Sequence, residues 1–217
     1  MRHLTSLAVV LASGLVVACG DQQSPLAPAL GGGPLFSAAN AASVSSAPVL
    51  TFDDMTEVGA SKIVRNADGV AVQLSTTGLE PGTAVTLWMI AFNNPENCTP
   101  PGCGEDDVAP GTAAMVDVIN VTGSLVGGSG KATVAAHHRA GEVGYSVFNL
   151  LGAPAPGLIE PGSAEIHLVV RSHGQMIPGL AYEMTHTFAA GCSGFPAFFG
   201  TPEPNTCEDL QFAVHQP

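Results

Sequence analysis

Short runs in which polar and apolar residues alternate, separated by turns rich in glycine and proline, recur along this chain and limit what it can fold into. In GVAVQLS, for example, Val70, Val72 and Leu74 stand at every second position. Side chains of a strand point alternately to its two faces, so this spacing predicts a strand with one apolar face. Helical periodicity is scarce, and 26 glycines and 17 prolines interrupt the runs. The pattern therefore predicts an all-β protein.

The predicted strands suit an antiparallel β-sandwich of the immunoglobulin-like kind, and a β-barrel is the alternative because both architectures require the same alternation. The run 84–94 is apolar on both faces, as expected for a central strand that is covered on both sides. Segments 113–126 and 130–142 are expected to pair around the sequence GGSG. The remaining predicted strands are 69–75, 163–173, 180–188 and 209–216.

The N-terminus begins with a single positive residue, Arg2, and an apolar stretch from Leu4 to Val17. That stretch is too short for a transmembrane helix, which needs about 20 apolar residues, and has the length of a signal-peptide core. It ends in VVAC, residues 16–19, followed by polar residues. This ending resembles the lipobox of bacterial lipoproteins, with Val16 where leucine is usual. The resemblance implies that residues 1–18 are a signal peptide and that a lipid is attached to Cys19.

A lipidated Cys19 implies an exported protein that its N-terminal acyl chains hold at a membrane. The expected location is the bacterial outer membrane, the cell surface or the periplasm. Residues 19–49 are dominated by glycine, alanine, serine and proline, so we interpret them as the lipidated cysteine and a flexible tether. Residues 50–217 suffice for a single domain with a sizeable core.

Four cysteines remain besides Cys19, an even number for a compartment in which disulfides persist. Cys98 and Cys103 bracket CTPPGC, and Cys192 and Cys207 bracket a second segment rich in turn residues. Four cysteines allow three pairings, of which the two local ones are favoured because each closes a segment with little regular structure. A zinc or redox site is the alternative, although CTPPGC lacks the CxxC spacing.

The chain is acidic, with a formal net charge of −12. The basic residues beyond the predicted signal peptide are Lys62, Arg65, Lys131, Arg139 and Arg171. Polyanions repel such a protein, which argues against nucleic acid or an anionic lipid surface as a partner.

Histidines are the main candidate ligands in this sequence. In AEIHLVVRSHG, Glu165, His167 and His173 share the face of the predicted strand opposite its apolar face. His137 lies on another predicted strand, and adjacency in one sheet would bring it toward them. Imidazole with a carboxylate is typical of zinc or copper sites; the alternative is hydrogen bonding on a solvated sheet face. His167 and His173 lie about 20 Å apart on an extended strand, so one ion can bind only one of them.

Two acidic loops surround the first predicted disulfide and carry oxygen atoms of the type that binds calcium. Their side chains are Asn93, Asn94, Glu96, Glu105, Asp106 and Asp107. The EF-hand spacing is absent, so a solvated acidic loop is the favoured interpretation and calcium ranks below copper or zinc.

Sequence motifs of catalysis are missing: the chain contains no GxSxG, no HExxH, no P-loop and no GxGxxG. We therefore expect a binding or structural module rather than an enzyme, with copper or zinc binding as the alternative function. Because loops commonly carry recognition, residues 93–110 and 150–162 are the expected contact surfaces. Their partner would be an envelope protein or a small ligand.

Overall fold

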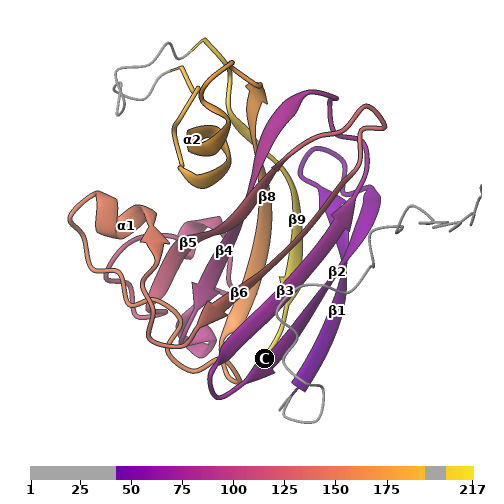
Figure 1. Cartoon of the computed structure of the whole chain (residues 1–217). Coiled ribbons are helices and arrows are strands. Elements are labelled where there is room, and N and C mark those ends of the chain that lie inside the picture. Colours follow the sequence, from indigo (N-terminus) through magenta and orange to yellow (C-terminus); the bar gives the residue numbers. More distant parts are fainter. Residues whose placement is uncertain (1–42, 194–203) are drawn as a thin grey trace, which may run out of the picture. The chain divides into compact units, whose positions relative to one another are not determined.

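Strands dominate the part of the chain that the computed structural model describes, residues 43–193 and 204–217 (Figure 1). The predicted signal peptide, Cys19 and most of the predicted tether lie outside these residues. The strands are β1 (Ser43–Thr51), β2 (Glu57–Asn66), β3 (Gly69–Thr76), β4 (Thr83–Phe92), β5 (Val116–Leu125), β6 (Ala132–Arg139), β7 (Tyr145–Ser146), β8 (Glu165–Gln175) and β9 (Glu208–His215). The helices are α1 (Val147–Leu150) and α2 (Ala181–His186), with 3₁₀ turns at Pro95–Asn97 and Glu105–Asp107.

All of these strands belong to one sheet in the order β6-β3-β2-β1-β9-β8-β4-β5-β7, and neighbouring strands run antiparallel. The sheet curls, so that β5 and β6 approach each other although they are far apart in the strand order (Figure 1). The predicted all-β, antiparallel fold is confirmed. Two halves of the sheet face each other across a core, as the layers of a sandwich do, while β1 and β9 connect them by hydrogen bonds.

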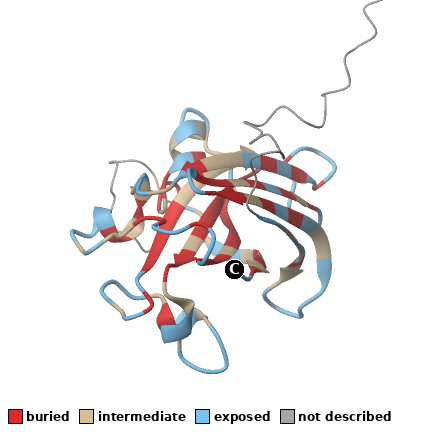
Figure 2. Cartoon of the chain, turned by 90° about the horizontal axis from the view of Figure 1, so that it is seen from below, coloured by how far each residue is buried: buried red, intermediate tan, exposed pale blue. Residues whose placement is uncertain are grey.

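The main core fills the inside of the curl. Strands β1 to β6, β8 and β9 all contribute apolar side chains to it, and Figure 2 shows the buried residues on the strands. Val70, Val72 and Leu74 are buried, as their alternation predicted. Ile166 and Leu168 on β8 are also completely buried, and they pack in the same cluster. Burial of this apolar surface is the main favourable contribution to folding.

A second apolar cluster covers the outer face of β4 and β8. Trp88, Phe92 and Val169 form its floor, and Phe148 and Phe188 from the later segments of the chain pack on it. β4 is consequently buried on both faces, as expected for the central run 84–94. The outer face of β8 is covered as well, which overturns the expectation of a solvated sheet face for its polar residues.

The segment between β5 and β6 differs from the expected hairpin around GGSG. β5 pairs with β4 and β7, whereas β6 pairs with β3. The connecting backbone instead lies against the turn between β3 and β4, where Leu79 N donates to Gly130 O and Gly82 N donates to Val126 O. The chain thus crosses here from one half of the sheet to the other.

Further elements differ from the sequence-based prediction, which also did not include β2. Residues 180–188 were expected to form a strand but contain α2, in which Met184 is completely buried and Tyr182 is exposed. The first strand begins at Ser43, seven residues before the predicted start of the domain at residue 50. Residues 43–49, predicted as part of the tether, pair with β2.

Both predicted disulfides are confirmed. Cys98 bonds to Cys103 and Cys192 bonds to Cys207. Disulfides are typical of proteins that fold in an oxidising, exported environment. Within residues 43–193 and 204–217, no helix has the length and apolar character needed to cross a membrane.

Candidate functional site

The four predicted metal ligands are distributed over three places in the fold. Glu165 and His167 meet on the outer face of β8, where His167 Nε2 lies 2.7 Å from Glu165 Oε1. His167 also packs against the ring of Phe92, with 4.9 Å between the ring centroids. His173 lies at the far end of β8, and His137 is on β6, at the edge of the other half of the sheet. The structure thus pairs only two of these four side chains.

His173 is completely buried and hydrogen-bonded through both ring nitrogens. Its Nδ1 donates to Ala190 O at 2.9 Å, and the hydroxyl of Thr86 donates to its Nε2 at 3.0 Å. Thr86 Oγ1 in turn accepts from Trp88 Nε1 at 2.7 Å. Burial lowers the pKa of His173 to about 4, so the imidazole is neutral near pH 7.

Two cysteines stand beside this neutral imidazole. The ligand atoms of His173, Cys192 and Cys207 all lie within 4.8 Å of one another, the one such group with metal-ligand spacing among the described residues. His173 Nδ1 lies 3.6 Å from Cys192 Sγ. In the oxidised protein both sulfur atoms are held in the disulfide.

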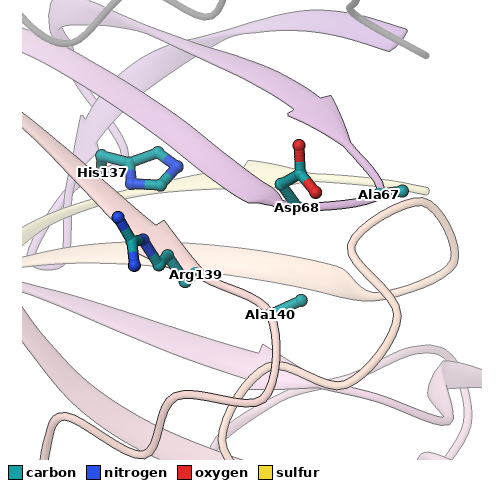
Figure 3. Close-up of a pocket in the computed structure, with 5 residues that line it drawn as sticks. All are labelled: Ala67, Asp68, His137, Arg139 and Ala140. Carbon is teal, nitrogen blue, oxygen red and sulfur yellow. The ribbon is translucent and has the colours of Figure 1, made fainter.

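A separate open hollow of about 500 Å³ lies where β6 ends beside the turn between β2 and β3. It is lined by Ala67, Asp68, His137, Arg139 and Ala140 (Figure 3). His137 and Arg139 are two residues apart on β6 and therefore point to the same face. Asp68 comes from the β2–β3 turn, so the hollow brings together a carboxylate, a guanidinium and an imidazole from two segments.

Local interactions fix the turn that carries Asp68. Asn66 Oδ1 accepts from the backbone nitrogens of Asp68 and Gly69, an arrangement that favours a tight turn. A side chain at Gly69 would place a Cβ only 2.1 Å from His138 O, so the close approach of β3 to β6 requires glycine there. Ala140 N donates to Asp68 O at 2.9 Å and closes the two segments around the hollow.

The charges of Asp68 and Arg139 are available to a ligand. Within the described part of the chain, the ion pairs are Glu165–His167 and Arg171–Asp209, and neither side chain of the hollow takes part. Partial burial and the nearby Arg139 lower the pKa of His137, so its ring is neutral near pH 7. The hollow therefore offers one anion and one cation, with the ring of His137 beside them.

The two loops predicted as contact surfaces are held together by Asn93. Its Nδ2 donates to Gly157 O at 2.9 Å, and its Oδ1 accepts from Ile159 N at 2.8 Å. Gly141 N donates to Leu158 O, which ties the second loop to the segment that follows β6. The two loops and the hollow consequently gather at the same end of the strands.

The acidic loop near the first disulfide uses one of its predicted calcium ligands for its own structure. The Asp107 carboxylate accepts from Thr99 N at 2.8 Å and from Gly104 N at 3.0 Å. These bonds hold the short segment between Cys98 and Cys103 against the 3₁₀ turn that follows it. Asn93, another of the six predicted oxygen ligands, is occupied by its bonds to the second loop.

No protein-family model matches this chain, and no curated protein matches it. Solved structures that are similar in part include a SOD-like protein from Bacillus subtilis and a single-residue mutant of that protein. The first has a TM-score of 0.36 and 13% identity, covering 79% of this chain and 99% of the other. The second has a TM-score of 0.35 and 11% identity, covering 79% and 97% respectively. Likeness at this level supports no conclusion about function.

Neither grouping follows from the sequence alone, because each depends on contacts between distant segments. Asp68 and Arg139 are brought together by the pairing of β3 with β6, which the alternation of residues does not specify. His173 and Cys192 are separated by a stretch that includes α2, so only the folded chain places them side by side. Spacing in the sequence carries no signal for either.

Proposed function

We propose that this chain is an exported envelope protein, held at a membrane by acyl chains on Cys19, whose β domain binds a small zwitterionic ligand. The two disulfides support export, because such bonds persist in oxidising compartments. The resemblance of residues 16–19 to a lipobox supports the anchor.

The hollow at the end of β6 is the observation that carries the ligand proposal. Arg139 suits a carboxylate, because a guanidinium can donate two parallel hydrogen bonds to it. Asp68 suits an ammonium group, and the ring of His137 lines the hollow beside them. A free amino acid carries an ammonium group and a carboxylate on the same carbon atom, and a dipeptide carries both at a larger separation. The two loops tied by Asn93 provide the adjoining surface.

Calorimetric titration of the protein with a panel of free amino acids and dipeptides tests this proposal. We expect at least one member of the panel to bind, and Arg139→Gln to weaken its affinity by about tenfold or more, since a charged hydrogen bond is lost. Asp68→Asn should lower the affinity for the same ligand and leave the affinity for simple carboxylates, which lack an ammonium group, unchanged.

Lys62→Gln is the matched control, because it removes one exposed positive charge from β2 away from the hollow. It should leave the affinity within about twofold of the unmodified protein. Equal binding by the Arg139 and Lys62 variants, or no binding by any member of the panel, would contradict the proposed site.

A further inference from the structure

The group formed by His173, Cys192 and Cys207 lies outside the hollow and has its own chemistry. We propose that reduction of the Cys192–Cys207 disulfide converts these three side chains into a site for monovalent copper. The oxidised protein would be closed to the metal, and the reduced protein would bind it. This inference is independent of the zwitterion site, which shares none of these residues.

The donor set favours a soft ion. Two thiolates and one imidazole, all within 4.8 Å of one another, match the preference of Cu(I) for sulfur ligands. Zinc also binds thiolates, but structural zinc sites take four protein ligands. Among the described residues the group supplies three, and His173 and Cys192 are both completely buried. A three-ligand sulfur–nitrogen site in which two ligands are buried and Cys207 is partly buried therefore fits Cu(I) better than Zn²⁺.

The two cysteines are held in place by more than their disulfide. Cys192 forms a bridge with Asn205, in which Asn205 N donates to Gly191 O and Ser193 N donates to Asn205 O. The Asn205 side chain also donates to His173 O at 2.8 Å and to Gln175 O at 2.9 Å. These bonds fasten the segment before Cys207 to Cys192 and to β8. Reduction would thus leave both thiols close to His173.

The histidine is also prepared to act as a ligand. If the metal binds Nδ1, the ring proton must be on Nε2. Nε2 can then donate a hydrogen bond to Thr86 Oγ1, which lies 3.0 Å away. A hydrogen bond on the nitrogen that does not bind metal fixes the tautomer and the ring orientation in metal sites. Ala190 O, which now accepts from Nδ1, would lose this bond when the metal enters.

The chemical balance of the switch is simple. Two electrons and two protons, supplied by a dithiol reductant, cleave the sulfur–sulfur bond and leave two thiols. One Cu(I) ion then replaces the two thiol protons, which are released to solvent. The resulting site has a net charge of −1. Arg171 and Asp209, which form an ion pair, both act electrostatically on His173, with opposite effects.

Copper titration of the full chain tests the switch. Cys19, Cys98 and Cys103 are replaced by serine, so that the remaining thiols are those of the proposed site. The reduced protein is titrated with Cu(I) without oxygen, in competition with a chromogenic Cu(I) chelator. We expect about one Cu(I) per chain after reduction, none before it, and an affinity at least about tenfold lower in His173→Gln.

His186→Gln is the control, because it removes an exposed imidazole from the neighbouring helix α2. Introduced into the protein in which Cys19, Cys98 and Cys103 are replaced by serine (the parent protein), it should leave the affinity for Cu(I) unchanged. X-ray absorption on the reduced parent protein gives a measurement that needs no histidine variant, and it should show sulfur and nitrogen ligands together. Absence of Cu(I) binding, a copper site with sulfur ligands alone, or unchanged affinity in His173→Gln would each overturn the proposal.

Discussion

His215 shows how a single buried side chain links the stability of this domain to pH. It is 1% exposed, and both ring nitrogens are hydrogen-bonded. Ser61 donates its proton to Ala47 O, so its oxygen accepts from His215 Nε2 at 2.8 Å, while Ser45 donates to Nδ1 at 2.9 Å. Burial, followed by the electrostatic effects of Arg65 on β2 and of His167 on β8, lowers the pKa of His215 to about 4.

The consequence is a loss of stability in mild acid. Between about pH 6.5 and pH 4 the unfolded chain binds a proton at this imidazole and the folded chain does not, so the free energy of unfolding falls as the pH is lowered. This histidine alone accounts for a loss of about 3 kcal/mol across that window. Urea unfolding between pH 4 and pH 8 measures how steeply the free energy of unfolding depends on pH. This dependence should be weaker in His215→Gln, by the uptake of about one proton on unfolding.

The exposed His186 provides the comparison for this measurement. His186→Gln removes an imidazole without removing a buried hydrogen-bonding group, so it should keep the slope of the unmodified protein. Identical slopes in His215→Gln and the unmodified protein would show that His215 does not control the acid sensitivity.

At the scale of single elements, alternation predicted where most strands lie but not which strands pair. The faces of β3 and β8 are as predicted, because apolar residues at every second position must face the core. Pairing depends on the whole sheet, and the expected hairpin of β5 with β6 is replaced by a crossing between the two halves. The polar face of β8 was expected to be solvated because its cover comes from segments remote in sequence, including Phe148 and Phe188.

Helix α2 was not predicted, because the pattern of its residues is ambiguous. Gly123 on β5 allows the helix to pack against that strand. Residues 180–188 satisfy both a strand period and a helix period over so short a length. The backbone of α2 packs directly on β5, where a Cβ at Gly123 would lie 2.1 Å from Thr185 O. The absence of a side chain at this position lets the helix lie against the strand.

We expect Gly123→Ala to displace α2 and to lower the free energy of unfolding by about 2 kcal/mol, because overfilling a packed contact forces the backbone to move. Thermal unfolding followed by circular dichroism measures the loss. Gly127→Ala is the matched control, since a Cβ there meets no atom within 4 Å. Equal melting temperatures for the two variants would show that α2 does not depend on contact with Gly123.

At the scale of the whole molecule, the cysteines were the most informative residues in the sequence. Turn-rich segments between close cysteines predicted both disulfides, because short loops bring their ends together at little entropic cost. The proximity of one disulfide to His173 had no counterpart in the sequence, since it depends on how the segment that contains α2 leads back from β8 to Cys192. Cys19 is the remaining cysteine, and the lipid predicted on it would hold the whole chain at a membrane.

Replacement of Cys19 by serine should release the protein from the membrane. A lipobox directs acyl chains to this thiol, and two or more chains anchor a protein stably, whereas serine cannot accept the thioether-linked lipid. We expect the unmodified protein in the membrane fraction, extracted only by detergent, and the Cys19→Ser variant in the soluble fraction. Mass spectrometry of the N-terminal peptide should detect acyl chains in the protein that has Cys19 and none in the Cys19→Ser variant.

Serine at both Cys98 and Cys103 is the matched control, because it removes thiols that the structure places in a disulfide. This variant should stay in the membrane fraction. An ordinary secretory signal with an incidental cysteine would instead yield a soluble unmodified protein without acyl chains. Soluble behaviour of that kind would argue against the anchor but not against export, since the disulfides are typical of an oxidising compartment in either case.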